Sequence, residues 1–202
     1  SGEWHYGLRC DTDWFEEFEK TDQTGEKEQG YCVEQVGLLT MRKVIEEPYE
    51  IELDYAEEGY LSMMGRTLKE GRYPAEEGEA ALDEFTLRNL DIPRKIGTTF
   101  TLDGETFTLC GIVSEQPSAL TQRMQVFVDP TRDYGTNGRF LYVKFEESKD
   151  IYRQMSAFAD TFGISKKEIA ANWELVEWLK NGTRINAAEA VKTGILHWKE
   201  AG

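Results

Sequence analysis

The side chains that could do chemistry in this sequence are mainly carboxylates. Glu79, Asp83 and Glu84 lie close together along the chain, and two such acids can act as the general acid and general base of a hydrolase. Closeness in sequence does not place two carboxylates across a substrate, and Asp83 has a sufficient role as the N-cap of a short helix. Because the chain holds 38 acidic residues, such clusters arise by chance. We therefore predict that the chain is not an enzyme and has no catalytic residue.

The residue types that metal sites and catalytic triads require are scarce. His5 and His197 are the only histidines, one near each end of the sequence, which leaves little for a triad or a multi-histidine metal site. Asp11-x-Asp13 lacks the later ligands and the glycine of a calcium-binding EF-hand loop. No nucleophile elbow, phosphate-binding loop or dinucleotide-binding glycine motif is present. We therefore predict neither a metal site nor a cofactor.

Three cysteines leave the redox chemistry open. Cys10, Cys32 and Cys110 show no C-x-x-C spacing and are too few for a disulfide-rich scaffold or a cysteine-rich zinc site. A Cys10–Cys32 bridge could form outside the cytoplasm. Buried free thiols are the favoured alternative, because cysteine packs as a small hydrophobic residue.

Composition predicts a globular protein. A chain of 202 residues with 40% hydrophobic and 12% aromatic content can bury the core of one large domain or two small ones. The 38 acidic residues outnumber the 23 basic ones and are dispersed, which gives a net charge of -15. A surface of this sign repels nucleic acid and anionic lipid headgroups, so we predict no nucleic-acid partner. A cationic ligand stays open, although dispersed acidity is typical of solubility alone.

Helices and strands that would carry these side chains follow from residue periodicity. Trp14, Phe15 and Phe18 share one face of a helix expected over residues 13–20. Strands are expected over 31–39 and 49–55. In the second strand the odd-numbered positions are aliphatic or aromatic and the even-numbered ones are acidic. We therefore predict a buried face and a solvent-exposed acidic face.

The middle of the chain is punctuated by glycine and favours short strands. Residues 79–82 are typical of a strand, after which Asp83 can cap a helix that runs to Leu90. Asp103-Gly104 separates two alternating runs within residues 100–113 and predicts a hairpin. Further strands are expected over 125–129 and 139–145.

Two amphipathic helices are predicted in the last third. Apolar residues at 151, 155, 158 and 162 predict a helix that ends at Gly163. Ser165 and Glu168 match a capping box, so a second helix would follow directly, with Trp173 in its buried stripe and Asn181-Gly182 at its end. Residues 187–199 are compatible with a helix of unassigned position.

These elements predict an α+β fold. Strands lie on both sides of a distinct middle region, and the helices concentrate near the two ends. We expect residues 1–59 and 119–202 to form a discontinuous mixed α/β subdomain, with residues 60–118 as an inserted β-rich subdomain. No stretch approaches the about 20 apolar residues of a membrane-spanning helix, so we expect the chain as given to fold in water.

One stretch carries a recognisable pattern. Residues 68–83 read LKEGRYPAEEGEAALD, in which a G-R-x-P turn precedes a short spacer and a strand. A G-T-x-F-x-L strand follows at 97–102, and a strand that ends in C-G-I-V follows at 107–113. Gly71 can adopt backbone conformations that other residues resist, and Pro74 stiffens the turn. These residues are typical of a structural framework.

This pattern resembles the extracytoplasmic domain of bacterial ABC-transporter permeases of the MacB/FtsX type. The likeness is specific over residues 60–113 and looser over 120–180, and Ala80 and Cys110 replace residues that are usually β-branched. It implies a MacB periplasmic core-like fold and structural roles for the motif residues Gly71, Arg72, Pro74, Glu79, Asp83, Gly97 and Gly111.

The resemblance implies a non-catalytic module at the outer face of a bacterial cell membrane. Its expected partners are membrane-spanning helices of the same polypeptide and a separate cytoplasmic ATPase subunit, in a dimeric permease. The module would couple ATP hydrolysis to export, extraction or signalling, with a peptide or lipoprotein as the substrate class. A cationic peptide or another extracytoplasmic protein is a further candidate partner. The alternative is a free-standing secreted or lipid-anchored binding protein of the same fold.

Overall fold

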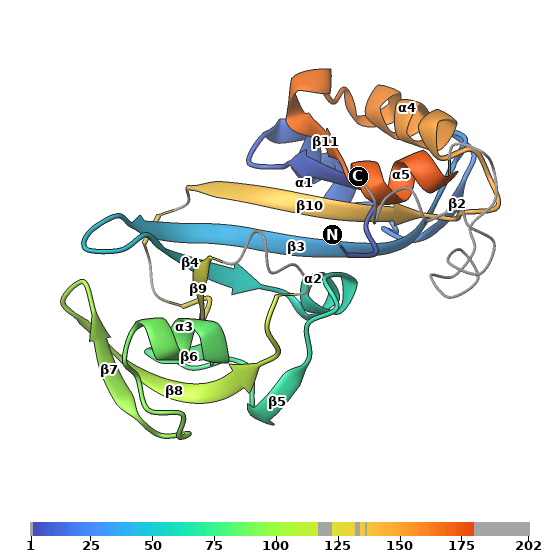
Figure 1. Cartoon of the computed structure of the whole chain (residues 1–202). Helices are drawn as coiled ribbons and strands as arrows, with labels where there is room; N and C mark the ends of the chain where they lie inside the picture. The colour runs from blue at the N-terminus through green and yellow to red at the C-terminus, as the bar shows by residue number, and fades with distance from the viewer. Residues whose placement is uncertain (1, 117–122, 132–133, 136, 180–202) are drawn as a thin grey trace, which may run out of the picture.

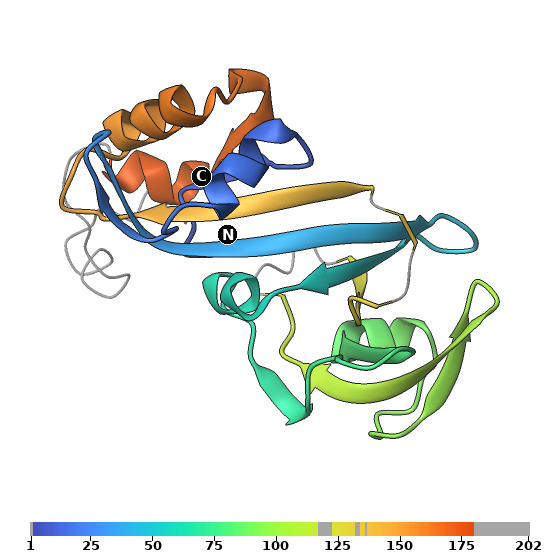
Figure 2. The ribbon, with the colours of Figure 1, turned by 180° about the vertical axis from the view of Figure 1, so that it is seen from behind.

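The computed structural model describes residues 2–116, 123–131, 134–135 and 137–179. The strands within these residues form one mixed sheet in the order β11-β1-β10-β3-β4-β9-β6-β8-β5, with β2 beside β3 and β7 beside β8. Two long strands, β3 and β10, cross the middle of the molecule, with most helices on one side of them and a smaller β-rich part on the other (Figures 1 and 2). The α+β fold class is thereby confirmed.

The part that contains most of the helices is called here the aromatic lobe. Its elements are β1 (Tyr6–Arg9), α1 (Asp13–Glu19), β2 (Gly25–Lys27), β3 (Tyr31–Ile45), β10 (Gly138–Phe145), α4 (Ile151–Phe162), a short 3-10 turn (Lys166–Glu168), β11 (Ile169–Ala171) and α5 (Trp173–Leu179). Helices α1, α4 and α5 pack on one face of the sheet around a single apolar cluster.

Aromatic rings fill the core of this lobe. The ring of Phe158 on α4 lies 5.6 Å from Phe18 on α1, 5.1 Å from Tyr31 on β3 and 5.9 Å from Phe145 on β10, measured between centroids. Phe158 is fully buried. The predicted helices over 13–20 and 151–162 are confirmed, and Gly163 ends α4 in the left-handed conformation, with φ of 65°.

The β-rich part is called here the aliphatic lobe. Its elements are β4 (Ile51–Ala56), β5 (Leu68–Gly71), β6 (Glu79–Asp83), α3 (Glu84–Asn89), β7 (Thr99–Leu102), β8 (Glu105–Val113) and β9 (Met124–Val128). Its core consists mainly of Leu, Ile and Val side chains from α3 and the strands. The predicted hairpin is confirmed: β7 and β8 pair on either side of Asp103 and Gly104, both of which have positive φ.

Strand β3 belongs to both lobes. Residues 33–41 pair with β10, and Tyr31 and Val33 belong to the aromatic core. Residues 39–45 pair with β4, and Ile45 belongs to the aliphatic core. A third apolar cluster at the junction packs helix α2 (Glu58–Met63) against Leu39 of β3. The division of the chain at residues 60 and 118 stays a prediction. Strand β9, which follows that second boundary, pairs with β4 and β6 of the aliphatic lobe.

The prediction of a solvent-exposed acidic face on the second strand is wrong. On β4, Asp54 is fully buried and Glu52 is 8% exposed, whereas Tyr49 just before the strand is 56% exposed. The reason is that both faces of β4 are covered: the aliphatic core lies on one side and the junction with α2 on the other. Alternation in sequence reports a half-buried strand only where one face meets water.

The predicted helix after Ser165 is also wrong in its start. Ser165 does cap a turn, but only the 3-10 turn at 166–168 follows, and then strand β11 pairs with β1 before α5 begins at Trp173. Trp173 is 63% exposed, contrary to its predicted place in the core, whereas Val176 and Leu179 are buried as expected. Residues 181–182 and 187–199 lie outside the described residues.

Candidate functional site

The motif loop between β5 and β6 closes around one carboxylate. Glu79 opens β6 and accepts hydrogen bonds from the backbone N–H groups of Ala75 (3.1 Å) and Glu76 (2.6 Å). Arg72 pairs with both oxygens of Glu79, and its Nη1 lies 2.8 Å from Oε1. The Arg72 guanidinium lowers the pKa of Glu79 to about 2, and the two backbone donors add to the effect. Pro74 lies within this loop. The ionised Glu79 fixes the loop through its contacts with residues 72, 75 and 76.

Two motif glycines allow β5 and β8 to touch through their backbones. A Cβ atom on Gly71 would lie 2.1 Å from the carbonyl oxygen of Cys110, and one on Gly111 would lie 2.2 Å from the carbonyl oxygen of Arg72. Gly71 also has a φ of 71°. Gly97 differs, because its φ is 93° but a Cβ atom there would meet nothing within 4 Å. Gly71 and Gly111 thus serve close packing, and Gly97 serves backbone shape.

Asp83 ends β6 and performs two tasks. Its Oδ1 accepts the backbone N–H of Thr86 at 2.8 Å, which confirms its predicted role as the cap of α3. Its Oδ2 receives Arg66 Nη2 at 3.2 Å, and both side chains are almost fully buried, with 2% and 4% exposure. A buried ion pair needs further hydrogen bonds to offset desolvation. Arg66 supplies one of them by donating to the carbonyl of Ser114 at 2.9 Å.

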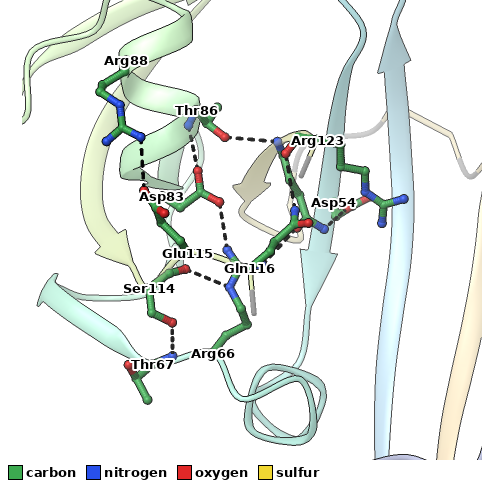
Figure 3. A network of polar contacts seen from close by, with 11 residues as sticks. Asp54, Arg66, Thr67, Asp83, Thr86, Arg88, Ser114, Glu115, Gln116 and Arg123 are labelled. Carbon is green, nitrogen blue, oxygen red and sulfur yellow. Dashed lines mark hydrogen bonds and ion pairs between the residues drawn. The ribbon is translucent and has the colours of Figure 1, made fainter. Parts of the chain in front are cut away.

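Arg66 is the centre of a polar network at the junction of the lobes (Figure 3). Besides Asp83 and Ser114, its guanidinium approaches Gln125 Oε1 at 3.4 Å and lies over the ring of Phe127, 5.5 Å from the centroid. Gln125 Nε2 in turn donates to Asp54 Oδ2 at 2.6 Å. The network therefore links five segments, namely the end of α2, the end of β6, the end of β8, β9 and β4.

The acid pair of β4 lies at the inner end of this network. Burial raises the pKa of Asp54 well above its usual value, and the neighbouring Glu52 adds to the rise. Glu52 pairs with the exposed Arg123 at 3.3 Å. The second oxygen of Asp54 is buried and has no hydrogen-bond partner among the described residues. Folding therefore favours the protonated form of Asp54.

The three acids that were considered for catalysis and rejected, Glu79, Asp83 and Glu84, are not brought together. Glu79 pairs with Arg72, Asp83 pairs with Arg66, and Glu84 pairs with Arg94 at 2.8 Å. Each carboxylate is therefore assigned to a separate ion pair, and none faces another across a cavity. Among the described residues, no group of three or more His, Cys, Asp and Glu side chains could hold a metal ion.

The remaining candidates also have structural surroundings. His5 is fully buried, where Nδ1 accepts the backbone N–H of Phe145 (2.8 Å) and Nε2 lies 3.1 Å from Glu147. His197 lies outside the described residues. Asp11 forms an ion pair with Arg9 at 2.9 Å. The His5 side chain thus joins the start of β1 to the end of β10 through hydrogen bonds.

The cysteines are free thiols, and the Cys10–Cys32 bridge does not fit this fold. Cys10 lies beside Arg139, which pairs with Thr40 on β3, eight residues along the strand from Cys32. This separation corresponds to about 26 Å at the rise of a β-strand, whereas a disulfide needs Cα atoms within about 7 Å. Burial raises the pKa of Cys10 to about 12 and that of Cys110 to about 11.

Arg66, Gln125 and the burial of Asp54 were not predicted from the sequence. Arg66 follows α2, a helix of six residues that is too short for apolar periodicity to predict. One local signal was available, because Gly65 follows a short apolar run and has the positive φ of a helix C-cap. No local signal identifies the partners of Arg66, which lie 17 and 59 residues away in sequence.

Comparison with known proteins identifies the fold. Neither a protein-family model nor a curated protein matches the chain. Among solved structures, the periplasmic region of MacB from Actinobacillus actinomycetemcomitans is similar, with a TM-score of 0.50 and 14% identity, over 90% of this chain and 94% of that one. The extracellular domain of the noncanonic ABC-type transporter YknZ from Gram-positive bacteria gives 0.50 and 15%, over 83% and 98%.

A permease-protein domain from Porphyromonas gingivalis is similar at a TM-score of 0.46 and 17% identity, over 68% of this chain and 74% of that one. The fold predicted from the pattern in residues 68–113 is confirmed by the MacB and YknZ domains. No described helix of this chain is both long enough and apolar enough to cross a bilayer.

Proposed function

We propose, on the premise that this chain has the fold of the MacB and YknZ domains, that it is the extracytoplasmic domain of a bacterial ABC-transporter permease. It would be a non-catalytic module at the outer face of the cell membrane. Its partners would be membrane-spanning helices of the same polypeptide and a separate cytoplasmic ATPase subunit, in a dimeric permease. Its task would be to couple ATP hydrolysis to export, extraction or signalling, with a peptide or lipoprotein as the substrate class.

The extent of the structural likeness carries this proposal. The match with the MacB region spans 90% of this chain and 94% of the other, so it includes both lobes and their connection. A match confined to one lobe would have been compatible with a common β-sheet motif. Fold alone does not fix function, so the proposal also needs features of this chain that suit a mechanical role.

The connection between the lobes suits the transmission of movement. Strand β3 is hydrogen bonded to β10 in the aromatic lobe and to β4 in the aliphatic lobe, so backbone bonds join the two parts directly. The network around Arg66 adds a buried ion pair at the same junction. A force applied to one lobe would reach the other through these backbone bonds and the buried ion pair, which supports movement of the domain as one body.

Segments far apart in sequence are tied together on the aromatic lobe. Asn172, just before α5, donates through Nδ2 to the carbonyls of Gly2 (3.1 Å) and Trp4 (2.9 Å), and its backbone N–H donates to the carbonyl of His5. Asn172 is buried. This contact places residues 2–5 beside residue 172, so an N-terminal and a C-terminal segment lie together, as the proposal requires.

Membrane fractionation of the complete protein in its bacterium tests the assignment. We expect the protein to remain in the membrane pellet after an alkaline carbonate wash and to co-purify with an ATP-hydrolysing subunit. A secreted binding protein would be found outside the cells. A lipid-anchored one would take up labelled palmitate and would bring down no ATPase. Either of these last results would replace the proposal with its alternative.

A distance measurement tests the coupling itself. A spin label on Thr106→Cys, an exposed position of the aliphatic lobe, reports the separation of two copies in the purified permease complex. We expect ATP binding to change this separation, whereas the same preparation without the ATPase subunit should show no change. The Glu28→Cys variant is a matched probe on the exposed surface of the aromatic lobe. No ATP-dependent change at either position would argue against coupling.

A further inference from the structure

We propose that the cavity between the β3–β4 hairpin and the α3–β7 segment is a docking site for a cationic, amphipathic peptide segment, with an apolar side chain inside and lysine or arginine residues at the rim. The inference rests on the proposed function for its biological meaning, because it names the partner class of an outward-facing domain. The binding it asserts is a property of this chain and can be measured without any transporter.

The cavity has a volume of about 690 Å³ and an apolar floor. Six side chains of this kind line it, namely Ile45, Ile51, Leu90, Ile92, Phe100 and Leu102. Most of them also belong to the aliphatic core, so the floor is held by the packing of the lobe. A space of this size lined in this way is suited to a large aliphatic or aromatic side chain.

The hairpin side of the rim is acidic and unpaired. Glu46, Glu47 and Glu50 occupy the exposed connection between β3 and β4, and none of them forms an ion pair in the described part of the chain. Tyr49, between them, lines the cavity and is 56% exposed. An exposed aromatic ring among carboxylates attracts a cation through both its face and the surrounding charge.

The opposite side of the rim adds charge of the same sign. Asp91, after α3, lines the cavity and is likewise without an ion pair among the described residues. Two nearby cations are engaged: Lys43 pairs with Asp103 at 2.8 Å, and Arg88, which also lines the cavity, pairs with Glu115 at 3.4 Å. Three acids, Glu47, Asp91 and Asp103, and one base, Arg88, line the cavity, so acidic side chains are in excess around its apolar floor.

A second cavity adjoins the first and leaves room for an extended ligand. It has a volume of about 470 Å³ and shares Arg88, Asp91, Ile92 and Pro93 with the first. Two adjoining cavities along the end of α3 can take side chains from successive parts of one segment. Another copy of this chain is disfavoured as the occupant, because each copy carries a net charge of -15.

Calorimetric titration of the 202-residue chain with a synthetic lysine–leucine–tryptophan peptide tests the site. We expect binding that weakens as salt is raised, and no binding of a matched peptide with glutamate in place of lysine. The triple variant E47Q/E50Q/D91N should weaken binding about tenfold, because rim charges steer association. Tyr49→Ala should weaken it about fivefold by removing an aromatic contact. Both variants change exposed side chains, so the fold should persist, which circular dichroism checks.

The matched control removes the same number of charges from the aromatic lobe. E16Q/D22N/E28Q alters three exposed acids far from the cavity and should leave the affinity nearly unchanged. Equal weakening by both triple variants would overturn the site and leave only attraction to the total charge. Binding of the glutamate peptide, or binding of the lysine peptide that Tyr49→Ala does not weaken, would also overturn it. Membrane fractionation is independent of these results, so the two proposals can fail separately.

Discussion

The two lobes are stabilised in different ways, although one sheet runs through both. In the aromatic lobe, rings from distant segments meet around Phe158 and fill the space between the helices and the sheet. In the aliphatic lobe, backbones approach until no Cβ atom fits, as at Gly71 and Gly111, and Asp83 forms a buried ion pair with Arg66. Stability therefore depends mainly on side-chain volume in the aromatic lobe and on backbone contact and charge pairing in the aliphatic lobe.

The largest effect is expected from removing volume in the aromatic lobe. Phe158→Ala deletes the ring on which the core converges and should lower the free energy of unfolding by about 3–5 kcal/mol. Urea denaturation followed by tryptophan fluorescence measures the change. Tyr152→Ala on the same helix, where the side chain is 39% exposed, is the control and should change stability by less than about 1 kcal/mol. A small loss at Phe158 would break the comparison.

A glycine pair tests backbone contact in the aliphatic lobe. Gly71→Ala places a methyl group against the Cys110 carbonyl at a positive φ, so it should cost about 2–4 kcal/mol of folding free energy. Gly97→Ala meets open space and should cost only about 1 kcal/mol, from its positive φ alone. Thermal unfolding of both variants measures the difference. Equal losses would show that contact with Cys110 is unimportant.

The ion pair and hydrogen bonds that Glu79 forms in the motif loop should weaken in acid. The pKa of Glu79 is lowered from its usual 4.5 to about 2, so the folded state binds fewer protons than the unfolded chain. The resulting stability is present above pH 4.5 and disappears as the pH falls toward 2. At neutral pH, Glu79→Gln should cost about 1–2 kcal/mol, because Arg72 is half exposed.

Denaturation of wild type and Glu79→Gln at a series of pH values measures this effect. The difference between them should shrink between pH 4.5 and 2, whereas Glu76→Gln, at an exposed neighbour, should match wild type throughout. A difference that stays constant across this range would show that the Glu79 side chain acts through packing and not through charge.

The smallest expected effect has the opposite sign. Asp54 has a raised pKa, so the folded state binds a proton that the unfolded chain releases above about pH 4. The free energy of unfolding of the wild type should therefore fall as the pH rises above about 4. Asp54→Asn cannot ionise and should be more stable than wild type by about 1 kcal/mol at pH 8, with no gain at pH 4. Asp22→Asn, at an exposed site, is the control. A loss of stability at pH 8 would contradict the protonated state.

Elements that depend on local signals could be predicted from the sequence. The four-three-four spacing before Gly163 is sufficient to identify α4, and Asp103-Gly104 is sufficient to identify the β7–β8 hairpin. Strand β11 could not be found in this way, because its three residues are ordered by pairing with β1 at the other end of the chain. The burial of Asp54 likewise depends on α2 and β9, which no local pattern places beside it.

The residues of the candidate site were likewise predictable only where their partners are close in sequence. The motif contained Arg72 and Glu79, which are seven residues apart and pair with each other, and it contained Asp83 as a helix cap. It did not contain Arg66, whose binding partners are contributed by β6, β9 and the end of β8. The cavity could not be predicted from the sequence either, because it forms where the β3–β4 hairpin meets residues 88–103.

The position of β3 at the centre of the sheet determines the order in which its partner strands become available during synthesis. Its partner β10 is about a hundred residues later in the chain, whereas β4 follows it almost at once. At a typical rate of about 5–20 residues per second, one edge of β3 stays unpaired for roughly 5–20 seconds while the aliphatic lobe is made. Unpaired strand edges are templates for aggregation. Until β10 emerges, this edge of β3 is therefore open to pairing with other chains.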